Sequence, residues 1–272
     1  MFTANRRPIA ILVYHHISEP PSVGSPYRDL HVTPLNFERQ ISLLARLGYT
    51  GHSMSGLEPY LSGEKHGKVV GITFDDGYLN NLSNAMPILN FYGFSSTCYV
   101  VSSLIGRTNL WDAGIGVPEA GLMDTIQLQA WVRGGQEVGS HTQNHINLLH
   151  RDDELCRFEI ASARAELEAA IEQRVKHFAY PYGAYGARHA AMARECGYVT
   201  ATTTRQARCN TRVDMLQLPR ISVLRTTSQG MLWVNVATAY TDALDSVRSA
   251  ARRGRAMILD QKPFGSASAG DS

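Results

Sequence analysis

The chain has 272 residues, of which 44% are hydrophobic and 18% charged, and its formal net charge is +2 at pH 7. These values are typical of one large globular domain, and a charge so close to zero gives no electrostatic argument for a nucleic-acid partner. Four cysteines are scattered without a C-x-x-C pair, so we expect reduced thiols rather than a zinc knuckle.

The N-terminus has a basic start, but the apolar run at residues 9–14 is too short for the core of a signal peptide. No window approaches the roughly 20 apolar residues that cross a membrane. We therefore expect a cytoplasmic protein. A basic run at residues 248–255 suits the end of a helix, and peripheral contact with an anionic membrane is the alternative interpretation.

Short runs rich in Val, Ile, Tyr and Thr alternate with segments of helical periodicity, which is typical of parallel strands joined by helices. Their continuous apolar character favours burial on both faces of a sheet. The expected strands are residues 9–14, 68–74, 95–101, 136–140, 177–181, 198–204 and 216–223.

The clearest helix follows Thr33, which can cap it, with Pro34 at its first position and Gly48 at its end. Residues 104–122 contain four glycines and little periodicity, and such a long loop in a compact domain is often functional. The remaining expected helices cover residues 79–90, 124–132, 152–173, 187–196 and 229–252, with Pro87 limiting or kinking the first of them.

Two acids stand side by side in the stretch "GITFDDGYLN", residues 71–80, directly after an expected strand. Asp-Gly is ordinary turn chemistry, so these acids alone decide nothing. Another strand ends at Ser140 and is followed by His141 and His145, which fall on one side of the chain if it enters a helical turn.

In a parallel α/β barrel, loops from different strands converge at the carboxyl ends of the strands. Two neutral imidazoles and one carboxylate can hold a divalent ion and leave positions open for water. The second carboxylate is then free to act as a base beside the activated water. We therefore expect one aspartate to bind a metal and the other to accept a proton.

The motifs "TFDDGY", "SHTQNH" and "FAYPYGAYG", in this order, resemble those of the polysaccharide deacetylase family, carbohydrate esterase family 4, which includes chitooligosaccharide deacetylases. The resemblance covers about residues 9–223 and implies a distorted (β/α) barrel of about seven parallel strands in a single domain. We expect a catalytic domain over residues 1–262 and a disordered tail over residues 263–272.

The resemblance implies that Asp75 is the general base. It also implies that Asp76, His141 and His145 bind a divalent metal, zinc in the first place, with cobalt or nickel as alternatives. Tyr180, Pro181 and Tyr182 would line the substrate groove. The stretches "LVYHHI" and "VTPLNFERQISLLARLGYT" further resemble the subgroup that acts on exopolysaccharides rich in N-acetylglucosamine.

Two positions depart from the family pattern. Tyr180 stands near the place of an arginine that steadies the base, and the final leucine-x-histidine motif reads Leu218, Pro219, Arg220. Leu218 would still line the substrate site, while Arg220 would either hold Asp75 or stabilise the oxyanion. Because the motif histidine is missing, the candidate proton donors for the leaving amine are His15 and His16, at the end of the first strand.

The resulting hypothesis is metal-dependent removal of N-acetyl groups from an amino sugar in a polysaccharide or in a glycoconjugate precursor such as a lipid-linked glycan. Deformylation, hydrolysis of another amide or ester, and an inactive carbohydrate-binding protein remain alternatives. Trp111 and Trp131 can stack on sugar, although ordinary packing is the simpler interpretation of both.

Overall fold

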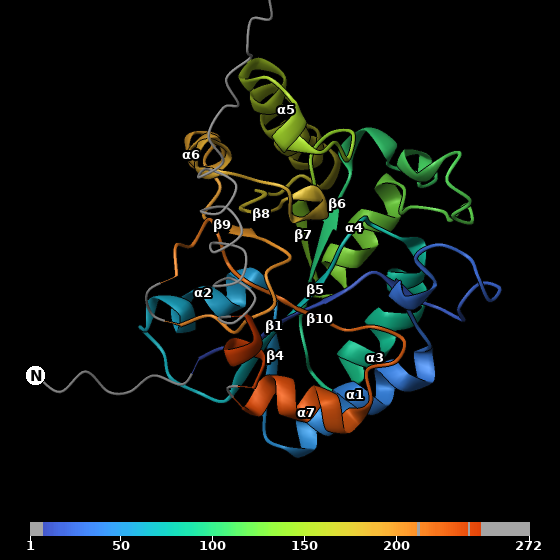
Figure 1. The fold of residues 1–272 in the computed structure, drawn as a ribbon, viewed down its shortest axis with the longest axis vertical. Helices are drawn as coiled ribbons and strands as arrows, with labels where there is room; N and C mark the ends of the chain where they lie inside the picture. The colour runs from blue at the N-terminus through green and yellow to red at the C-terminus, as the bar shows by residue number, and fades with distance from the viewer. Residues whose placement is uncertain (1–7, 211–212, 239, 246–272) are drawn as a thin grey trace, which may run out of the picture.

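The computed structural model describes residues 8–210, 213–238 and 240–245 (Figure 1). The strands are β1 (Ile11–Tyr14), β2 (His16–Ile17), β3 (His31–Val32), β4 (Thr50–His52), β5 (Val69–Phe74), β6 (Thr97–Val100), β7 (Glu137–Ser140), β8 (His177–Ala179), β9 (Thr200–Thr202) and β10 (Ile221–Ser222). The α-helices are α1 (Pro34–Arg46), α2 (Met54–Ser62), α3 (Met86–Phe91), α4 (Thr125–Arg133), α5 (Asp153–Ile171), α6 (Ala187–Glu195) and α7 (Gln229–Ala237).

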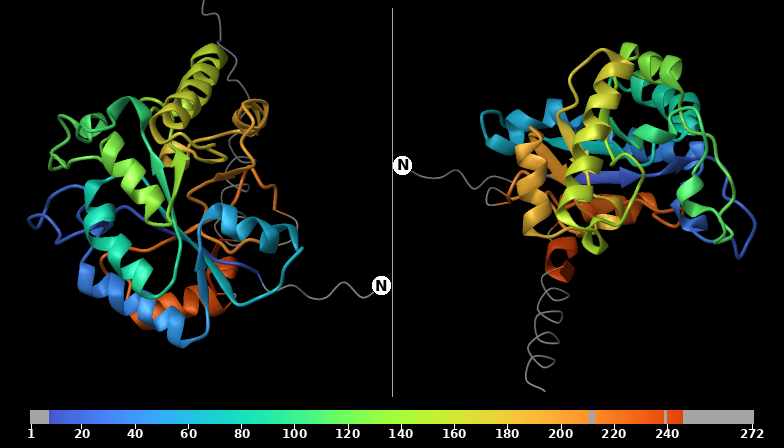
Figure 2. Two further views of the ribbon diagram at one scale, coloured as in Figure 1. Left: turned by 180° about the vertical axis from the view of Figure 1, so that it is seen from behind. Right: turned by 90° about the horizontal axis from the view of Figure 1, so that it is seen from above.

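The main sheet is parallel and has the order β10-β1-β5-β6-β7-β8-β9, with β4 pairing beside β5. It curls, and helices lie around its outside (Figures 1 and 2). Leu218 continues the curl beyond β9, because its N–H donates to Ala201 O at 2.9 Å and its carbonyl accepts from Thr203 N at 2.9 Å. The expected distorted (β/α) barrel in one domain is confirmed.

The expected strands are present, and most expected helices begin and end within a few residues of their predicted bounds. Thr33 caps α1 as expected, since its side chain accepts from Asn36 N at 3.3 Å. The segment before α3 is instead a π-helix, Asn81–Ala85, and Pro87 lies at the start of α3 rather than in a helix interior. The sequence pattern gave no sign of this wider turn.

One predicted helix, residues 229–252, is wrong as a single element. The helix α7 ends at Ala237, where Thr238 adopts an extended conformation with φ −118° and ψ 166°. The basic run at 248–255 and the predicted tail at 263–272 lie outside the described residues. No helix in the described part of the chain is long and apolar enough to cross a membrane.

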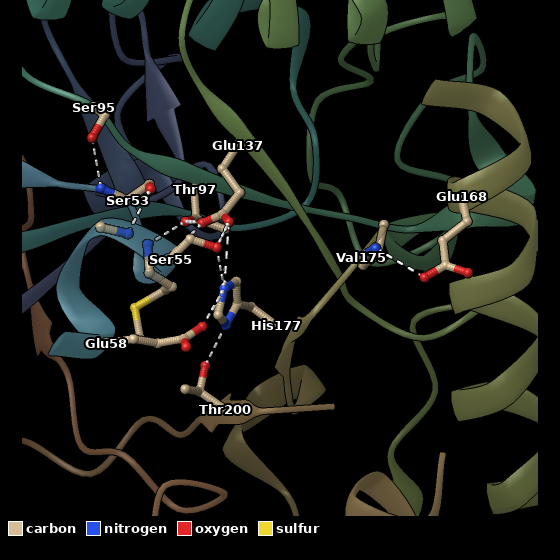
Figure 3. Close-up of polar contacts among 12 residues, drawn as sticks. Ser53, Ser55, Glu58, Ser95, Thr97, Glu137, Glu168, Val175, His177 and Thr200 are labelled. Atoms are coloured by element: carbon tan, nitrogen blue, oxygen red, sulfur yellow. Dashed lines mark hydrogen bonds and ion pairs between the residues drawn. The ribbon is translucent and has the colours of Figure 1, made fainter. Parts of the chain in front are cut away.

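A polar network lies at the amino ends of four neighbouring strands, opposite the ends that carry the motifs (Figure 3). Its members Thr97, Glu137, His177 and Thr200 are each the first residue of a strand, and Ser55 of α2 joins them. His177 Nε2 lies 2.9 Å from Ser55 Oγ, and its Nδ1 lies 2.8 Å from Thr200 Oγ1.

This network is no Ser-His-Glu triad. The carboxylate of Glu137 lies 3.3 Å from His177 Nε2, the nitrogen that already faces Ser55, whereas a triad acid must bind Nδ1. His177 is also fully buried and cannot meet a substrate. The network instead ties α2 to the sheet, because Ser55 N donates to Glu137 at 3.1 Å and Met54 N donates to Thr97 Oγ1 at 2.8 Å.

Candidate active site

The two adjacent acids end β5 and point to different partners. Asp75 N donates to Tyr14 O at 3.0 Å, so Asp75 still continues the pairing with β1. Asp76 has a φ of 76°, a left-handed conformation that non-glycine residues rarely adopt. The two carboxylates accordingly have different partners, since Asp75 pairs with Arg220 and Asp76 lies beside two imidazoles.

Asp76, His141 and His145 form a buried group whose ligand atoms lie within 4.8 Å of one another. The Oδ1 atom of Asp76 lies 3.5 Å from His141 Nε2 and 3.4 Å from His145 Nε2. The structure therefore brings together the three residues that the family resemblance implies as metal ligands.

The protonation of these groups fits a cation. Burial lowers the pKa of both imidazoles, that of His145 well below its usual range, so that their Nε2 lone pairs are available at neutral pH. Burial, and next the charge of Asp75, raises the pKa of Asp76 well above its usual range. A cation between the three would offset the cost of burying this second carboxylate so close to the first.

Each imidazole is oriented through its other nitrogen. His141 Nδ1 lies 2.8 Å from Ala179 O, and His145 Nδ1 lies 3.1 Å from the hydroxyl of Tyr182. Such outer contacts fix the ring and the tautomer of a metal-binding histidine, leaving Nε2 for the metal. They are the strongest structural argument that this group fits a divalent ion.

The chain does not enter a helical turn between the two histidines. Thr142 and His145 have φ values of 65° and 55°, and the segment forms an irregular loop. Glu159 of α5 fastens this loop, since its carboxylate accepts from Asn144 N at 2.9 Å and from Asn144 Nδ2 at 2.7 Å. Tertiary hydrogen bonds therefore bring the imidazoles together, rather than helical spacing.

Arg220 forms a buried ion pair with Asp75. Its Nη1 and Nη2 donate to the two carboxylate oxygens at 2.6 and 2.7 Å, and its Nε donates to Thr203 O at 3.0 Å. Burial is the largest single influence on Asp75 and would raise its pKa, but the charges of Arg220, His141 and His15 and the hydrogen bonds from Arg220 together outweigh it and hold that pKa well below its usual range. Arg220 is fully buried and does not line the pocket, which excludes the alternative of direct oxyanion stabilisation.

A pocket of about 120 Å³ opens over these groups. Six non-glycine residues in the described ranges have positive φ, and four of them, Tyr27, Asp76, His145 and Tyr182, line this pocket. Conformations of this kind are retained where a site needs them. The other lining residues are His15, His16, Leu30, His31, Asp75, Tyr78, Trp111, Asp112, Val117, His141 and Thr204.

His15 and His16 both line the pocket, in different surroundings. Burial lowers the pKa of His15 to about 4, and Asp75 is the strongest opposing charge on it. His16 is 5% exposed and lies between two rings, with centroids 3.6 Å from Tyr78 and 4.0 Å from His31. His15 thus interacts electrostatically with Asp75, whereas His16 lies against the rings of Tyr78 and His31.

Three residues predicted to bind substrate do not reach the pocket. Tyr180 is fully buried and donates its hydroxyl to Leu216 O at 3.0 Å, because it belongs to the core beneath β8. Pro181 is buried at the start of a 3-10 turn. Leu218 is 1% exposed in a small apolar cluster with residues of α2 and β1. Only Tyr182, half exposed, lines the pocket as predicted.

The loop over residues 104–122 contributes lining residues that the motifs did not identify. The ring of Trp111 lies 4.6 Å from that of His145, and the buried carboxyl of Asp112 accepts from Asn109 Nδ2 at 3.3 Å. Burial raises the pKa of Asp112. The sequence signals of this loop were its length, its glycine content and Trp111, whereas Asp112 and Val117 had none. Trp131 is fully buried in the core and donates to Glu137 O at 2.9 Å, so it packs rather than binds.

Comparison with known proteins gives a consistent result. The family model described as polysaccharide deacetylase matches residues 62–201, slightly more than half of the chain. YxkH of Bacillus subtilis is 26% identical over 217 residues, covering 79% of this chain and 71% of YxkH.

Solved structures agree on the fold. The deacetylase PplD of Streptococcus pyogenes, solved with acetate, has a TM-score of 0.72 and 25% identity, covering 85% of this chain and 99% of that one. IcaB of Ammonifex degensii has a TM-score of 0.69 and 24% identity, covering 84% and 97% of the two chains.

Proposed function

Because the chain belongs to the polysaccharide deacetylase family and is a hydrolase of N-acetyl amide bonds, we propose that it deacetylates an N-acetylated amino sugar with a bound divalent cation. The substrate is a polysaccharide or a glycoconjugate precursor. The observation that carries the proposal is the buried group of Asp76, His141 and His145 beside a second, separately held carboxylate, Asp75.

Asp76, His141 and His145 would hold the cation, with zinc the first choice and cobalt or nickel able to replace it. Bound there, a divalent cation supplies a polarised carbonyl and an attacking water that is unusually acidic. This matters for Asp75, because a carboxylate whose pKa Arg220 lowers is a weak base and needs an acidic partner.

In the proposed reaction, Asp75 takes a proton from water as the water oxygen bonds to the acetamide carbonyl carbon. The C–N bond then breaks, acetate leaves, and the amine takes up a proton. We assign this proton to His15, which lines the same pocket; burial lowers its pKa, and the charge of Asp75 partly opposes that lowering. His15 would regain its proton from Asp75, which would restore both groups for the next turnover.

The test is acetate release from N-acetylglucosamine oligomers by protein stripped of metal and then reloaded with zinc or cobalt. We expect metal-dependent release that is lost in Asp75→Asn, although this variant still binds metal. The metal itself should be lost in each of the variants Asp76→Ala, His141→Ala and His145→Ala. Full turnover by Asp75→Asn would refute its role as the base. Stoichiometric metal binding without acetate release would refute this substrate class and favour formamido sugars or esters.

A further inference from the structure

Asn80 connects the short strand β2 with the pocket. The N–H of Ile17 donates to Asn80 Oδ1 at 2.8 Å, and the carbonyl of Ile17 accepts from Asn84 Nδ2 at 2.7 Å. Because a backbone N–H can only donate, it must face the amide oxygen of Asn80 rather than the amide nitrogen. The side chain of Asn80 therefore has one possible orientation.

This orientation fixes the tautomer of His16. Asn80 Nδ2 lies 3.1 Å from His16 Nδ1, and an amide nitrogen can only donate. Nδ1 must then be the unprotonated acceptor, which leaves the ring proton on Nε2. A protonated imidazolium would place two donors against each other. Burial, and then the charges of His31 and His15, lower the pKa of His16 well below its usual range, in agreement with a neutral ring.

The ring of His16 is also fixed in position. It lies between Tyr78 and His31, and its plane is tilted by only 3° from that of His31. His31 is itself anchored, with Nδ1 3.0 Å from Ser18 Oγ. The stack and the contact with Asn80 together leave the imidazole little freedom to turn.

The remaining polar atom of His16 is its Nε2, for which no partner is found among the described residues, and His16 lines the pocket. The rings that contact His16 in the pocket are those of Tyr78 and His31, and no contact of His16 with Asp75 or Asp76 is found among the described residues. His16 is therefore beside the reacting centre rather than at it. A rigid, neutral N–H donor in this place suits an uncharged oxygen of the sugar.

We propose that His16 is a specificity-determining residue, which donates a hydrogen bond from Nε2 to a hydroxyl oxygen of the bound sugar and takes no part in proton transfer. Asn80 is its positioning residue. The assignment rests on the proposed function for the nature of the ligand. The two adjacent histidines then have different roles, because His15 exchanges protons with the substrate and His16 does not.

The tautomer is tested first, without any assay of activity. In ¹⁵N-labelled protein, NMR of the histidine side chains should identify His16 as neutral and protonated on Nε2 at pH 7. Asn80→Asp is the matched variant, since a carboxylate still accepts from Ile17 N but cannot donate to His16 Nδ1. We expect it to move a proton onto Nδ1. A wild-type His16 protonated on Nδ1, or an imidazolium, would overturn the proposal.

The role in recognition is tested with His16→Leu and His16→Gln, after their metal content and thermal unfolding have been matched to the wild type. Loss of one uncharged hydrogen bond should raise KM about tenfold or less in His16→Leu and leave kcat within about twofold. Gln carries an N–H₂ near the place of Nε2 and should recover part of the KM. A fall in kcat at unchanged KM, or no change in either, would contradict the assignment.

Substrate binding provides a separate measurement if the wild type releases no acetate. Titration of the metal-free protein with N-acetylglucosamine oligomers should shift the His16 Nε2 resonance, and His16→Leu should weaken binding. Binding of the oligomer without a shift at His16 would overturn this inference while leaving the proposed function in place. A shift at His16 without acetate release by the metal-loaded protein would support the inference and contradict the deacetylase assignment.

Discussion

Asp75 and Arg220 are 145 positions apart in the chain and form a buried, two-pronged ion pair. Arg220 reaches Asp75 because its segment runs between β9 and β10, with Leu218 paired to β9 and Ile221 paired to β1. The guanidinium has no exposed surface. Arg220 is thus a positioning residue, which sets the direction and the protonation of Asp75 without meeting the substrate.

We expect Arg220→Met to destabilise the protein by about 3–5 kcal/mol, because it leaves a buried carboxylate unpaired. Chemical denaturation of the metal-free protein measures this loss. Arg220→Lys keeps the charge but not the paired geometry and should lie between Arg220→Met and the wild type. A loss below about 1 kcal/mol in Arg220→Met would mean that the pair does not have this stabilising role.

Combining Arg220→Met with Asp75→Asn separates the ion pair from simple packing. The double variant buries no unpaired charge, so its loss should be clearly smaller than the sum of the two single losses. Metal content should stay near one equivalent in all three variants, because the nearest contacts of Arg220 are Asp75, Thr73 and Thr203 rather than the predicted ligands. Additive losses would contradict coupling between the two residues.

Features encoded by neighbouring residues were predictable from the sequence. Asp75 and Asp76 follow a continuous apolar run, and parallel strands bring their carboxyl ends to one edge, so the grouping of both acids with His141 and His145 could be expected from their positions at strand ends. The possible contact of Arg220 with Asp75 also followed, because the last predicted strand had to pair within the same sheet.

Features that depend on side-chain direction were not predictable. Tyr180 and Tyr182 are two residues apart, yet a turn with φ 59° at Tyr182 sends one ring to the pocket and leaves the other in the core. Leu218 carries a motif position but points into an apolar cluster. The helix α2 was not predicted; it begins after a cap, Ser53, and contains Pro59, and a proline inside a helix usually kinks or breaks it.

Tyr182 gives a test of how the histidine ligands are oriented. Its hydroxyl lies 3.1 Å from His145 Nδ1, the nitrogen that does not face Asp76. Removing such an outer contact usually costs a metal site about 10–100-fold in affinity. We therefore expect Tyr182→Phe to weaken zinc binding by about tenfold in a chelator competition. Tyr185→Phe is the control, since its hydroxyl contacts Gln217 at 3.3 Å, and it should bind zinc like the wild type. Equal affinities in both variants would exclude this role for Tyr182.

Trp111 tests whether the loop over residues 104–122 takes part in recognition. Its ring is partly exposed and lies against that of His145. An aromatic face at a pocket wall suits the apolar face of a sugar ring. Trp111→Ala should raise KM for the oligomers severalfold while metal content is retained. Ile115→Ala, at an exposed position of the same loop outside the pocket lining, is the control and should leave KM unchanged. An unchanged KM in Trp111→Ala would assign the ring to packing alone.

Glu137, in the network at the amino ends of the strands, should make stability depend on pH. Burial opposes ionisation of this carboxyl, but His177, and then the hydroxyls of Ser55 and Thr97, outweigh it and lower its pKa from 4.5 to about 2. The pKa of Glu137 is lower in the folded protein than in the unfolded chain, so the ionised carboxylate stabilises the fold. This contribution is complete above about pH 5 and is lost as the pH falls from 4.5 towards 2.

We expect Glu137→Gln to lower the free energy of unfolding near pH 7 by up to about 3 kcal/mol, which is the free-energy equivalent of this pKa shift. The difference from the wild type should shrink steadily between about pH 5 and pH 2. Glu119→Gln, at an exposed position, is the control and should differ little from the wild type at any pH. Urea denaturation at several pH values measures both variants. If the loss in free energy of unfolding in Glu137→Gln stays constant down to pH 2, lost packing would explain it rather than the lost charge of the Glu137 carboxylate.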